Sequence, residues 1–240
     1  MIDPAEQQRL ENVAQDSWYL TGVAPRTSHY NARIFKRHLR PGSILELGPA
    51  EGVMTAHLHP LTTDLTLVEG SPTFCRLLQQ SWPSASVVQA LFEDYSPGRT
   101  FDNIILGHVL EHVADPVAIL TRAREWLAPE GRILASVPNS RSLHRQAGVI
   151  LGLLPAEDAL NETDLHHGHR RVYSPELFRN HFLQSGLRID IFGGYWLKPM
   201  SNSQLTQSWN PEMLEAFMQL GERYPDIAAE IYLVASRPDA

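Results

Sequence analysis

The stretch Ser-Ile-Leu-Glu-Leu-Gly-Pro-Ala-Glu-Gly, residues 43–52, decides the fold of this chain. Its apolar half reads as a buried strand that ends beside an acidic residue, Glu46, and passes into a glycine turn that opens a helix. Glycines at 48 and 52 let the backbone turn tightly and approach a ligand, and the amides at the start of the following helix remain available to bind it. The stretch therefore predicts a strand followed by a cofactor-binding turn.

A dinucleotide-binding loop is the main alternative for this turn. Its G-x-G-x-x-G pattern needs glycine at positions 48, 50 and 53, where this chain has Gly48, Ala50 and Val53. The carboxylates of Glu46 and Glu51 would also repel a diphosphate and attract a ligand that carries positive charge. S-adenosylmethionine, with a sulfonium and an ammonium group, is such a ligand.

A second acidic residue follows the next predicted strand. The run at 64–69 ends in Glu69, roughly twenty residues after the first turn, where α/β nucleotide sites place a carboxylate on the ribose hydroxyls. A strand that merely happens to end in glutamate is the alternative, but the preceding turn favours a ribose contact.

Five segments in chain order give the sequence a family resemblance. It resembles the class I S-adenosylmethionine-dependent methyltransferases, of the small stand-alone kind typified by ubiquinone and natural-product methyltransferases. The matching segments are ELGPAEG at 46–52, VEGS at 68–71, QALFED at 89–94, FDNIILGHVLEHVADP at 101–116 and GRILASVPN at 131–139. One departure is Ala50, where the family usually has glycine; its methyl group is tolerable if φ is negative.

The resemblance implies S-adenosylmethionine as cofactor and assigns residues to it. Leu91 and Phe92 are expected to enclose the adenine, and Glu93 to accept a hydrogen bond from its amino group. The complete set of expected cofactor contacts is Glu46, Gly48, Ala50, Gly52, Glu69, Gly70, Ser71, Leu91, Phe92, Glu93, Gly107 and His108.

Strands and helices alternate along the rest of the chain. Apolar runs predict strands near 43–48, 64–69, 86–89, 101–107, 131–137, 187–193 and 229–236, with helices near 51–59, 71–81, 116–127 and 174–185. This pattern predicts an α/β fold with a mostly parallel sheet covered by helices on both faces. The resemblance implies a Rossmann-like sheet of seven strands whose last strand is antiparallel. We expect a single methyltransferase domain over 1–240, with a helical N-terminal cap at 1–40.

Two segments outside this alternation are expected to cover the substrate. The segment 138–173 carries Asn139, Arg145, His166, His167, Arg170 and Tyr173, and the segment 195–226 carries scattered aromatic residues. Both leave the sheet near the edge where α/β proteins bind ligands. The expected substrate contacts are these six residues together with Tyr19 and Tyr30 of the N-terminal segment.

Methyl transfer from a sulfonium needs alignment of the reacting atoms and a base for the acceptor's proton. His169 is the first candidate for the base, because related enzymes often show a histidine just before a helix start like that at Tyr173. His108 and His112, after the fourth strand, are further candidates, and for each histidine a purely structural role is the alternative.

The segment 138–173 suggests two alternatives, a metal site and an anion site. His166, His167 and His169 could bind a metal ion together with Glu111 or Asp164, but their spacing matches no closed zinc pattern and no cysteine is nearby, so no metal is expected. Arginines 141, 145, 170 and 171 suit a carboxylate or phosphate, whereas the four acidic residues at 157, 158, 162 and 164 favour internal ion pairing.

Composition limits the remaining function classes. The 240 residues, 43% hydrophobic with a formal net charge of −7, argue for one large core and against nucleic acid as a partner. The N-terminus shows no signal pattern and no apolar run is long enough to span a membrane, so we expect a cytoplasmic protein without a membrane partner. The expected partner is a small, anionic acceptor, such as a sugar nucleotide, a quinone precursor or a natural-product intermediate, that is methylated on oxygen or nitrogen. A homodimer is compatible with the sequence. A peptide or protein methyltransferase and an inactive binding protein are the alternatives.

Overall fold

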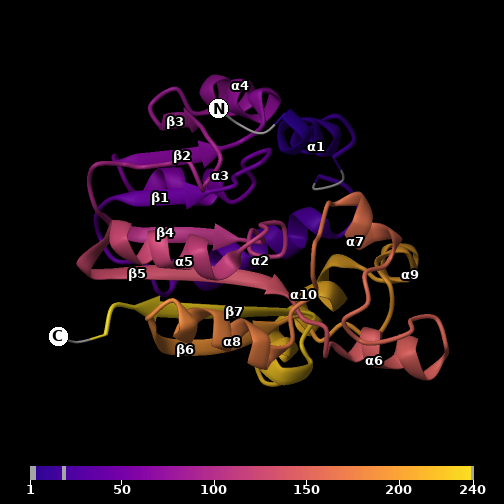
Figure 1. The fold of residues 1–240 in the computed structure, drawn as a ribbon. Coiled ribbons are helices and arrows are strands. Elements are labelled where there is room, and N and C mark those ends of the chain that lie inside the picture. Colours follow the sequence, from indigo (N-terminus) through magenta and orange to yellow (C-terminus); the bar gives the residue numbers. More distant parts are fainter. Residues whose placement is uncertain (1–3, 18–19, 239–240) are drawn as a thin grey trace.

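A seven-stranded sheet runs through the computed structural model, which describes residues 4–17 and 20–238 (Figure 1). Its strand order is β3-β2-β1-β4-β5-β7-β6. Only β7 runs against its neighbours, β5 and β6, which confirms the predicted mostly parallel sheet with an antiparallel last strand. The strands are β1 Ile44–Leu47, β2 Leu65–Glu69, β3 Ser86–Gln89, β4 Phe101–Gly107, β5 Leu127–Pro138, β6 Arg188–Tyr195 and β7 Glu230–Ser236.

Helices cover both faces of the sheet because successive apolar side chains of each strand point to opposite sides. In β4, Ile104 and Leu106 join a core formed with α5 (Pro116–Trp126) and α8 (Pro175–Gln184), whereas Ile105 joins the core on the other face. That second core includes side chains of α2 (Ala24–Lys36) and α10 (Pro211–Gly221). The continuous apolar runs of the sequence are thus explained by burial on both faces.

Helix starts follow the capping residues of the sequence. The side chain of Ser71 accepts from the amide of Phe74 at the start of α4 (Pro72–Ser81), and Ser174 does the same for Leu177 of α8. The helix expected near 51–59 is shorter, because Gly52 has φ +80° and α3 covers only Thr55–Leu58 before a 3₁₀ turn at His59–Leu61. Pro60 lacks the amide hydrogen needed to continue an α-helix.

The remaining helices differ in how they relate to the sheet. α6 (Leu143–Ile150) and α7 (Glu162–His166) project beyond the edge where the parallel strands end (Figure 1). α1 (Pro4–Gln15) lies beside α4, whereas α2 belongs to the layer on the sheet, so only part of the expected N-terminal cap stands apart. In the segment 195–226, α9 (Asn202–Ser208) is followed by α10, whose Leu214 and Met218 are buried in the core.

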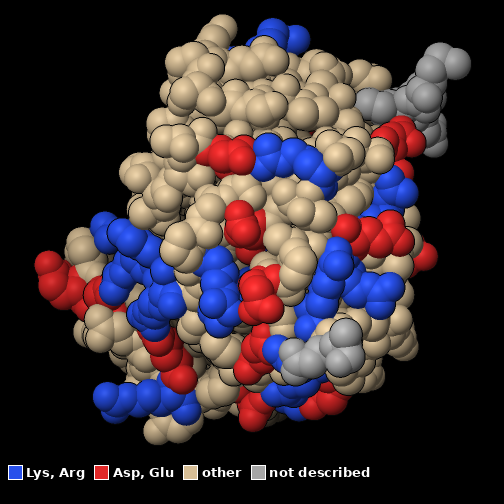
Figure 2. All heavy atoms as spheres, turned by 90° about the vertical axis from the view of Figure 1, so that its left-hand side faces the viewer, with Lys and Arg blue, Asp and Glu red and all other residues tan. Residues whose placement is uncertain are grey.

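No helix within residues 4–17 and 20–238 is long and apolar enough to cross a membrane. On the side of the molecule where the parallel strands begin, acidic and basic side chains are interleaved, and the upper part of this view is largely uncharged (Figure 2). Ion pairs such as Arg99 with Asp64 and Arg188 with Asp190, close to strand starts, account for part of this mixture.

Candidate functional site

A cavity of about 670 Å³ opens at the carboxyl ends of β1, β2 and β4. Parallel strands bring the residues that follow them to one edge of the sheet, which is where α/β proteins bind ligands. The antiparallel β7 reaches the same edge with its first residue, Glu230. α1, the start of α2, the α6–α7 segment and residues 196–202 close the cavity from the other sides.

Two buried carboxylates lie at one end, which we call the cofactor end. Glu46 is 2% exposed and accepts a hydrogen bond of 2.7 Å from the Thr55 hydroxyl. Glu69 is 6% exposed and accepts from the amides of Ala50, at 3.2 Å, and Ser71, at 2.8 Å. Burial raises the pKa of Glu46 to about 8 and also raises the pKa of Glu69. A ligand with positive charge would favour the ionised form of both.

The turn between these carboxylates is tight. Gly48 has φ +66°, and a Cβ atom there would lie 3.1 Å from a methyl carbon of Val109. Ala50 has φ +48°, so the condition of a negative φ, under which its methyl group would be tolerated without strain, is not met. The left-handed conformation costs a non-glycine residue about 1–2 kcal/mol. The hydrogen bond from the Ala50 amide to Glu69 helps to hold the turn in this conformation.

Gly52 is needed for packing and not for an approach to the cavity. A Cβ atom on Gly52 would lie 2.3 Å from the Trp82 ring, and Gly52 does not line the cavity. The other expected cofactor contacts, from Glu46 to Ala50 and from Glu69 to His108, do line it. Among them, the Ser71 hydroxyl already caps α4 and is bonded to Glu11 of α1.

α1 connects the two ends of the cavity. Glu11 accepts from Ser71 and Thr73 at the start of α4. Nearer the start of α1, Arg9 donates to the carbonyl of Gly168 at 3.1 Å, and Glu6 pairs with Arg170 at 2.9 Å. Leu10 lies close to Gly70: a Cβ atom added to Gly70 would lie 2.5 Å from a methyl carbon of Leu10.

Histidines and carboxylates form the opposite end, which we call the polar end. His108, in a left-handed conformation with φ +60°, has its Nδ1 at 3.2 Å from Glu111 and its Nε2 at 3.3 Å from the Tyr195 hydroxyl. Burial lowers the pKa of His108, but the hydrogen bond to Glu111 and the charge of Glu230 outweigh it and raise the pKa to about 9. A raised pKa favours the protonated form of His108, which makes it a weaker candidate for the base than His169.

His112 and His169 meet at the same end. Their rings are perpendicular, with centroids 4.8 Å apart, and both line the cavity. Burial lowers the pKa of His112 to about 3, so this ring is neutral. His169 has its Nδ1 at 3.3 Å from Asp164, and Asp164 forms a capping box with Asn161 at the start of α7.

The expected substrate contacts divide into two groups. Asn139, Arg145 and His167 line the cavity. Tyr30 does not, because it is buried, its ring stacks on Tyr195 and its hydroxyl donates to Glu222, the residue that caps the end of α10.

Three more expected substrate contacts lie outside the cavity, and a fourth is not described. Tyr173 is completely buried, with its hydroxyl 3.3 Å from the carbonyl of Leu110. His166 is bonded to the carbonyl of Asp16, at 2.9 Å. Arg170 donates to the carbonyl of His112 and pairs with Glu6, at 2.8 and 2.9 Å. Tyr19 lies outside the described residues.

The arginines expected to bind an anion are engaged within the protein. Arg141 makes a two-pronged pair with Glu176, and Arg145 pairs with Asp164 at 3.1 Å while donating to two loop carbonyls. Arg171 donates to three carbonyls of the loop after β4. Internal pairing therefore occurs, but only the Arg145–Asp164 pair uses one of the four acidic residues named from the sequence, whereas Arg141 and Arg170 pair with Glu176 and Glu6.

Acidic side chains outnumber basic ones around the cavity. The acidic lining residues are Glu6, Glu46, Glu51, Glu69, Glu93, Glu111, Asp164 and Glu230, against Arg9, Arg145 and Lys198. Lys198 is buried, which lowers its pKa to about 8. Such a lining favours ligands that carry positive charge.

Sequence reasoning missed several residues of the polar end. Glu230 could have been found from the fold, because an antiparallel last strand must begin at the edge where the parallel strands end. Lys198, and Asn31 of α2 with its buried side chain, carry no local signal in the sequence.

Comparisons with known proteins agree with this geometry. A family model described as a methyltransferase domain matches residues 19–190, well over half of the chain. A ubiquinone biosynthesis O-methyltransferase from Cereibacter sphaeroides is 29% identical over 160 residues; the match covers 58% of this chain and 65% of that protein, less than two thirds of its length.

Two solved structures share the fold. The CcbJ methyltransferase from Streptomyces caelestis superposes with a TM-score of 0.67 at 13% identity, covering 98% of this chain and 99% of that one. The N-methyltransferase NodS from Bradyrhizobium japonicum, solved with S-adenosylhomocysteine, gives a TM-score of 0.61 at 16% identity, covering 97% and 98%.

Proposed function

This chain belongs to the class I S-adenosylmethionine-dependent methyltransferases, and from this premise we propose that it methylates an oxygen or nitrogen of a small molecule bound at the polar end of the cavity. The observation that carries the proposal is one continuous cavity with two buried carboxylates at the cofactor end and a histidine–carboxylate group at the other. A cofactor and an acceptor can therefore meet inside it.

The residues of the cofactor end fit the expected cofactor. Glu69 lies at the end of β2, where its carboxylate can accept from both ribose hydroxyls, and Leu91 and Phe92 offer apolar walls to the adenine. Glu46 and the other acidic lining residues suit the ammonium and sulfonium charges. When bound, S-adenosylmethionine supplies a methyl group on a positively charged sulfur.

The polar end provides what an acceptor needs. Alignment of the acceptor atom with the methyl group is the first requirement, and Asn139, His167 and Lys198 line the surface that would hold it. Removal of the acceptor's proton is the second, and His169, with Asp164 behind it, is the candidate base in the metal-free protein.

The nature of the acceptor is narrowed by charge and by shape. The arginines that suggested an anionic acceptor are paired internally, and the polar end is lined by basic as well as acidic side chains, so we propose a neutral acceptor. A peptide groove is not favoured, because Leu205, Leu214 and Met218 of the segment 195–226 are buried in the core.

Two measurements test the proposal. Calorimetry should show binding of S-adenosylhomocysteine to the wild-type protein, and mass spectrometry of an acceptor panel should show a gain of one methylene unit with a hydroxyl or amine compound. Binding without transfer to any acceptor would favour the inactive binding protein. Absence of binding to both S-adenosylmethionine and S-adenosylhomocysteine would contradict the function.

A further inference from the structure

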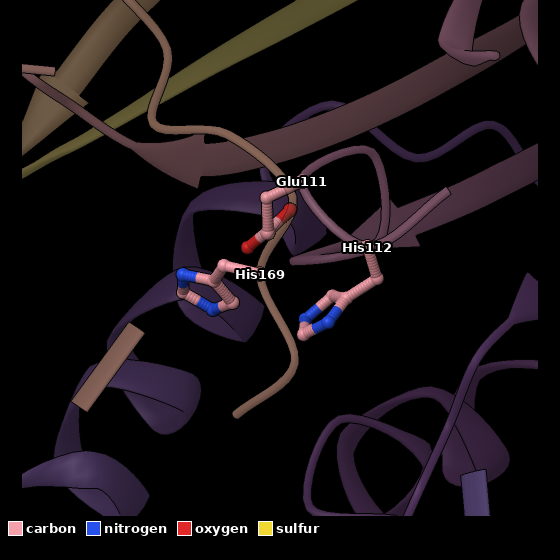
Figure 3. A group of neighbouring side chains, drawn as sticks. All are labelled: Glu111, His112 and His169. Carbon is pink, nitrogen blue, oxygen red and sulfur yellow. The ribbon is translucent and has the colours of Figure 1, made fainter. Parts of the chain in front are cut away.

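Three side chains converge at the polar end from two separate parts of the chain (Figure 3). Glu111 and His112 lie in the turn after β4, and His169 lies in the segment after α7. Each can offer one ligand atom, and these atoms all lie within 4.8 Å of one another. All three residues line the cavity.

Glu111 has an unsatisfied oxygen. Its side chain is completely buried, and one oxygen, Oε1, lies 3.2 Å from His108 Nδ1. The other oxygen, Oε2, has no hydrogen-bond partner among the described residues. A buried carboxylate oxygen without a donor is costly, and a cation bound beside it would remove that cost.

His169 is oriented for the same task. Its Nδ1 faces Asp164 at 3.3 Å, which leaves Nε2 as the nitrogen available to a ligand. A carboxylate behind the distal nitrogen is the usual arrangement of a metal-binding histidine. Asp164 is itself held by the amide of Asn161 at 3.0 Å and by Arg145 at 3.1 Å. The orientation of the His169 ring is therefore supported before any ion binds.

From these observations we propose that Glu111, His112 and His169 bind a divalent transition-metal ion that holds the hydroxyl of the acceptor. Two imidazoles and one carboxylate suit Zn²⁺, Mn²⁺ or Fe²⁺, whereas an all-oxygen set would suit Ca²⁺. Three protein ligands leave open positions for an acceptor. The proposal rests on the methyltransferase function and narrows its acceptor to a hydroxyl compound.

The sequence did not predict this site because its ligands are not neighbours in the chain. The sequence combined His166, His167 and His169 with Glu111 or Asp164 and did not include His112, but the structure places His166 against the carbonyl of Asp16 and His169 beside His112. Fifty-seven positions separate His112 from His169.

The ion would change the role of His169 and the chemistry at the polar end. With the ion bound, His169 is a ligand and not the base, and the ion lowers the pKa of the coordinated hydroxyl so that its proton passes to solvent. The oxygen then attacks the methyl carbon. A carbon–oxygen bond forms, the carbon–sulfur bond breaks, and its electron pair stays on sulfur, which becomes a neutral thioether.

Metal binding is measured directly with the full chain and Co²⁺ alone, by absorption spectroscopy and calorimetry. We expect one ion per chain and a visible spectrum of nitrogen and oxygen ligation. His112→Ala and Glu111→Gln should each weaken binding more than about 100-fold, and Asp164→Asn, behind His169, about 10- to 100-fold. Binding of S-adenosylhomocysteine should persist in all three variants, which shows that they are folded.

His57→Ala is the matched control, because Nε2 of the half-buried His57 lies 2.6 Å from Nδ1 of the exposed His29 and this pair could bind Co²⁺ at the surface. Co²⁺ binding that is lost with His57→Ala but kept with His112→Ala would overturn the proposal. So would a wild-type protein that binds S-adenosylhomocysteine but not Co²⁺, Zn²⁺ or Mn²⁺, in which case the methyltransferase function would stand without a metal. Failure of the wild-type protein to bind either form of the cofactor would instead contradict the function itself.

Discussion

The two ends of the cavity are built in different ways. At the cofactor end, β1 and β2 themselves carry Glu46 and Glu69, and backbone amides of the turns that follow these strands fix the Glu69 carboxylate. At the polar end, Glu111, His169 and Glu230 come from three separate parts of the chain and are held mainly by side-chain contacts. Local geometry therefore fixes the cofactor end, whereas the acceptor end depends on how distant segments meet.

Replacing His169 should give the largest effect and should be confined to the polar end. We expect His169→Gln to lower kcat by about 10²–10⁴, because the ring is needed there as base or as metal ligand. Single-turnover rates measure the loss, and calorimetry with S-adenosylhomocysteine is the control. A parallel loss of cofactor affinity would show that the two ends are not independent.

Replacing Glu69 tests the cofactor end in the same way. Glu69→Ala should weaken cofactor binding by about 1.5–3 kcal/mol if its charged carboxylate holds both ribose hydroxyls. Isothermal titration measures the dissociation constant, and Glu69→Gln separates the charge from the hydrogen bonds. Unchanged affinity in both variants would remove the ribose assignment.

The pH dependence of cofactor binding sharpens the comparison further. The pKa of Glu46 is raised to about 8 by burial, and the positive charge of S-adenosylmethionine favours the ionised form, so binding releases a proton. Affinity should therefore rise about five- to tenfold between pH 7 and pH 9 and level off above the pKa. Glu46→Gln should flatten this profile. A wild-type affinity that falls as the pH rises over this range would contradict the assignment of Glu46.

The smallest effect is expected at Ala50, whose φ of +48° favours glycine. Ala50→Gly should relieve left-handed strain and stabilise the fold by about 0.5–1 kcal/mol, which raises Tm by about 1–4 °C. Thermal unfolding measures this change, with Ala56→Gly in α3 as a control that should destabilise. A lower Tm for Ala50→Gly would mean that the methyl group contributes packing that outweighs its strain.

The same contrast explains what the sequence could predict. The positions of the strands and the turn at 43–52 follow from apolar runs and glycines that lie close together in the chain, and both were predicted. Tyr30, Arg170 and Tyr173 were assigned to the substrate because of their residue types and segments. The partners that engage them, Glu222, Glu6 and the carbonyl of Leu110, lie far away in sequence. Side-chain pairing over such distances cannot be deduced from local patterns.

The contacts of α1 have a kinetic consequence. Because this helix lines the cavity and is bonded both to the start of α4 and to residues 168 and 170, a movement of α1 would open the cofactor end and the polar end together. The half-exposed Glu6–Arg170 pair is weakened by salt, so ionic strength should ease this movement and speed the exchange of ligands at both ends.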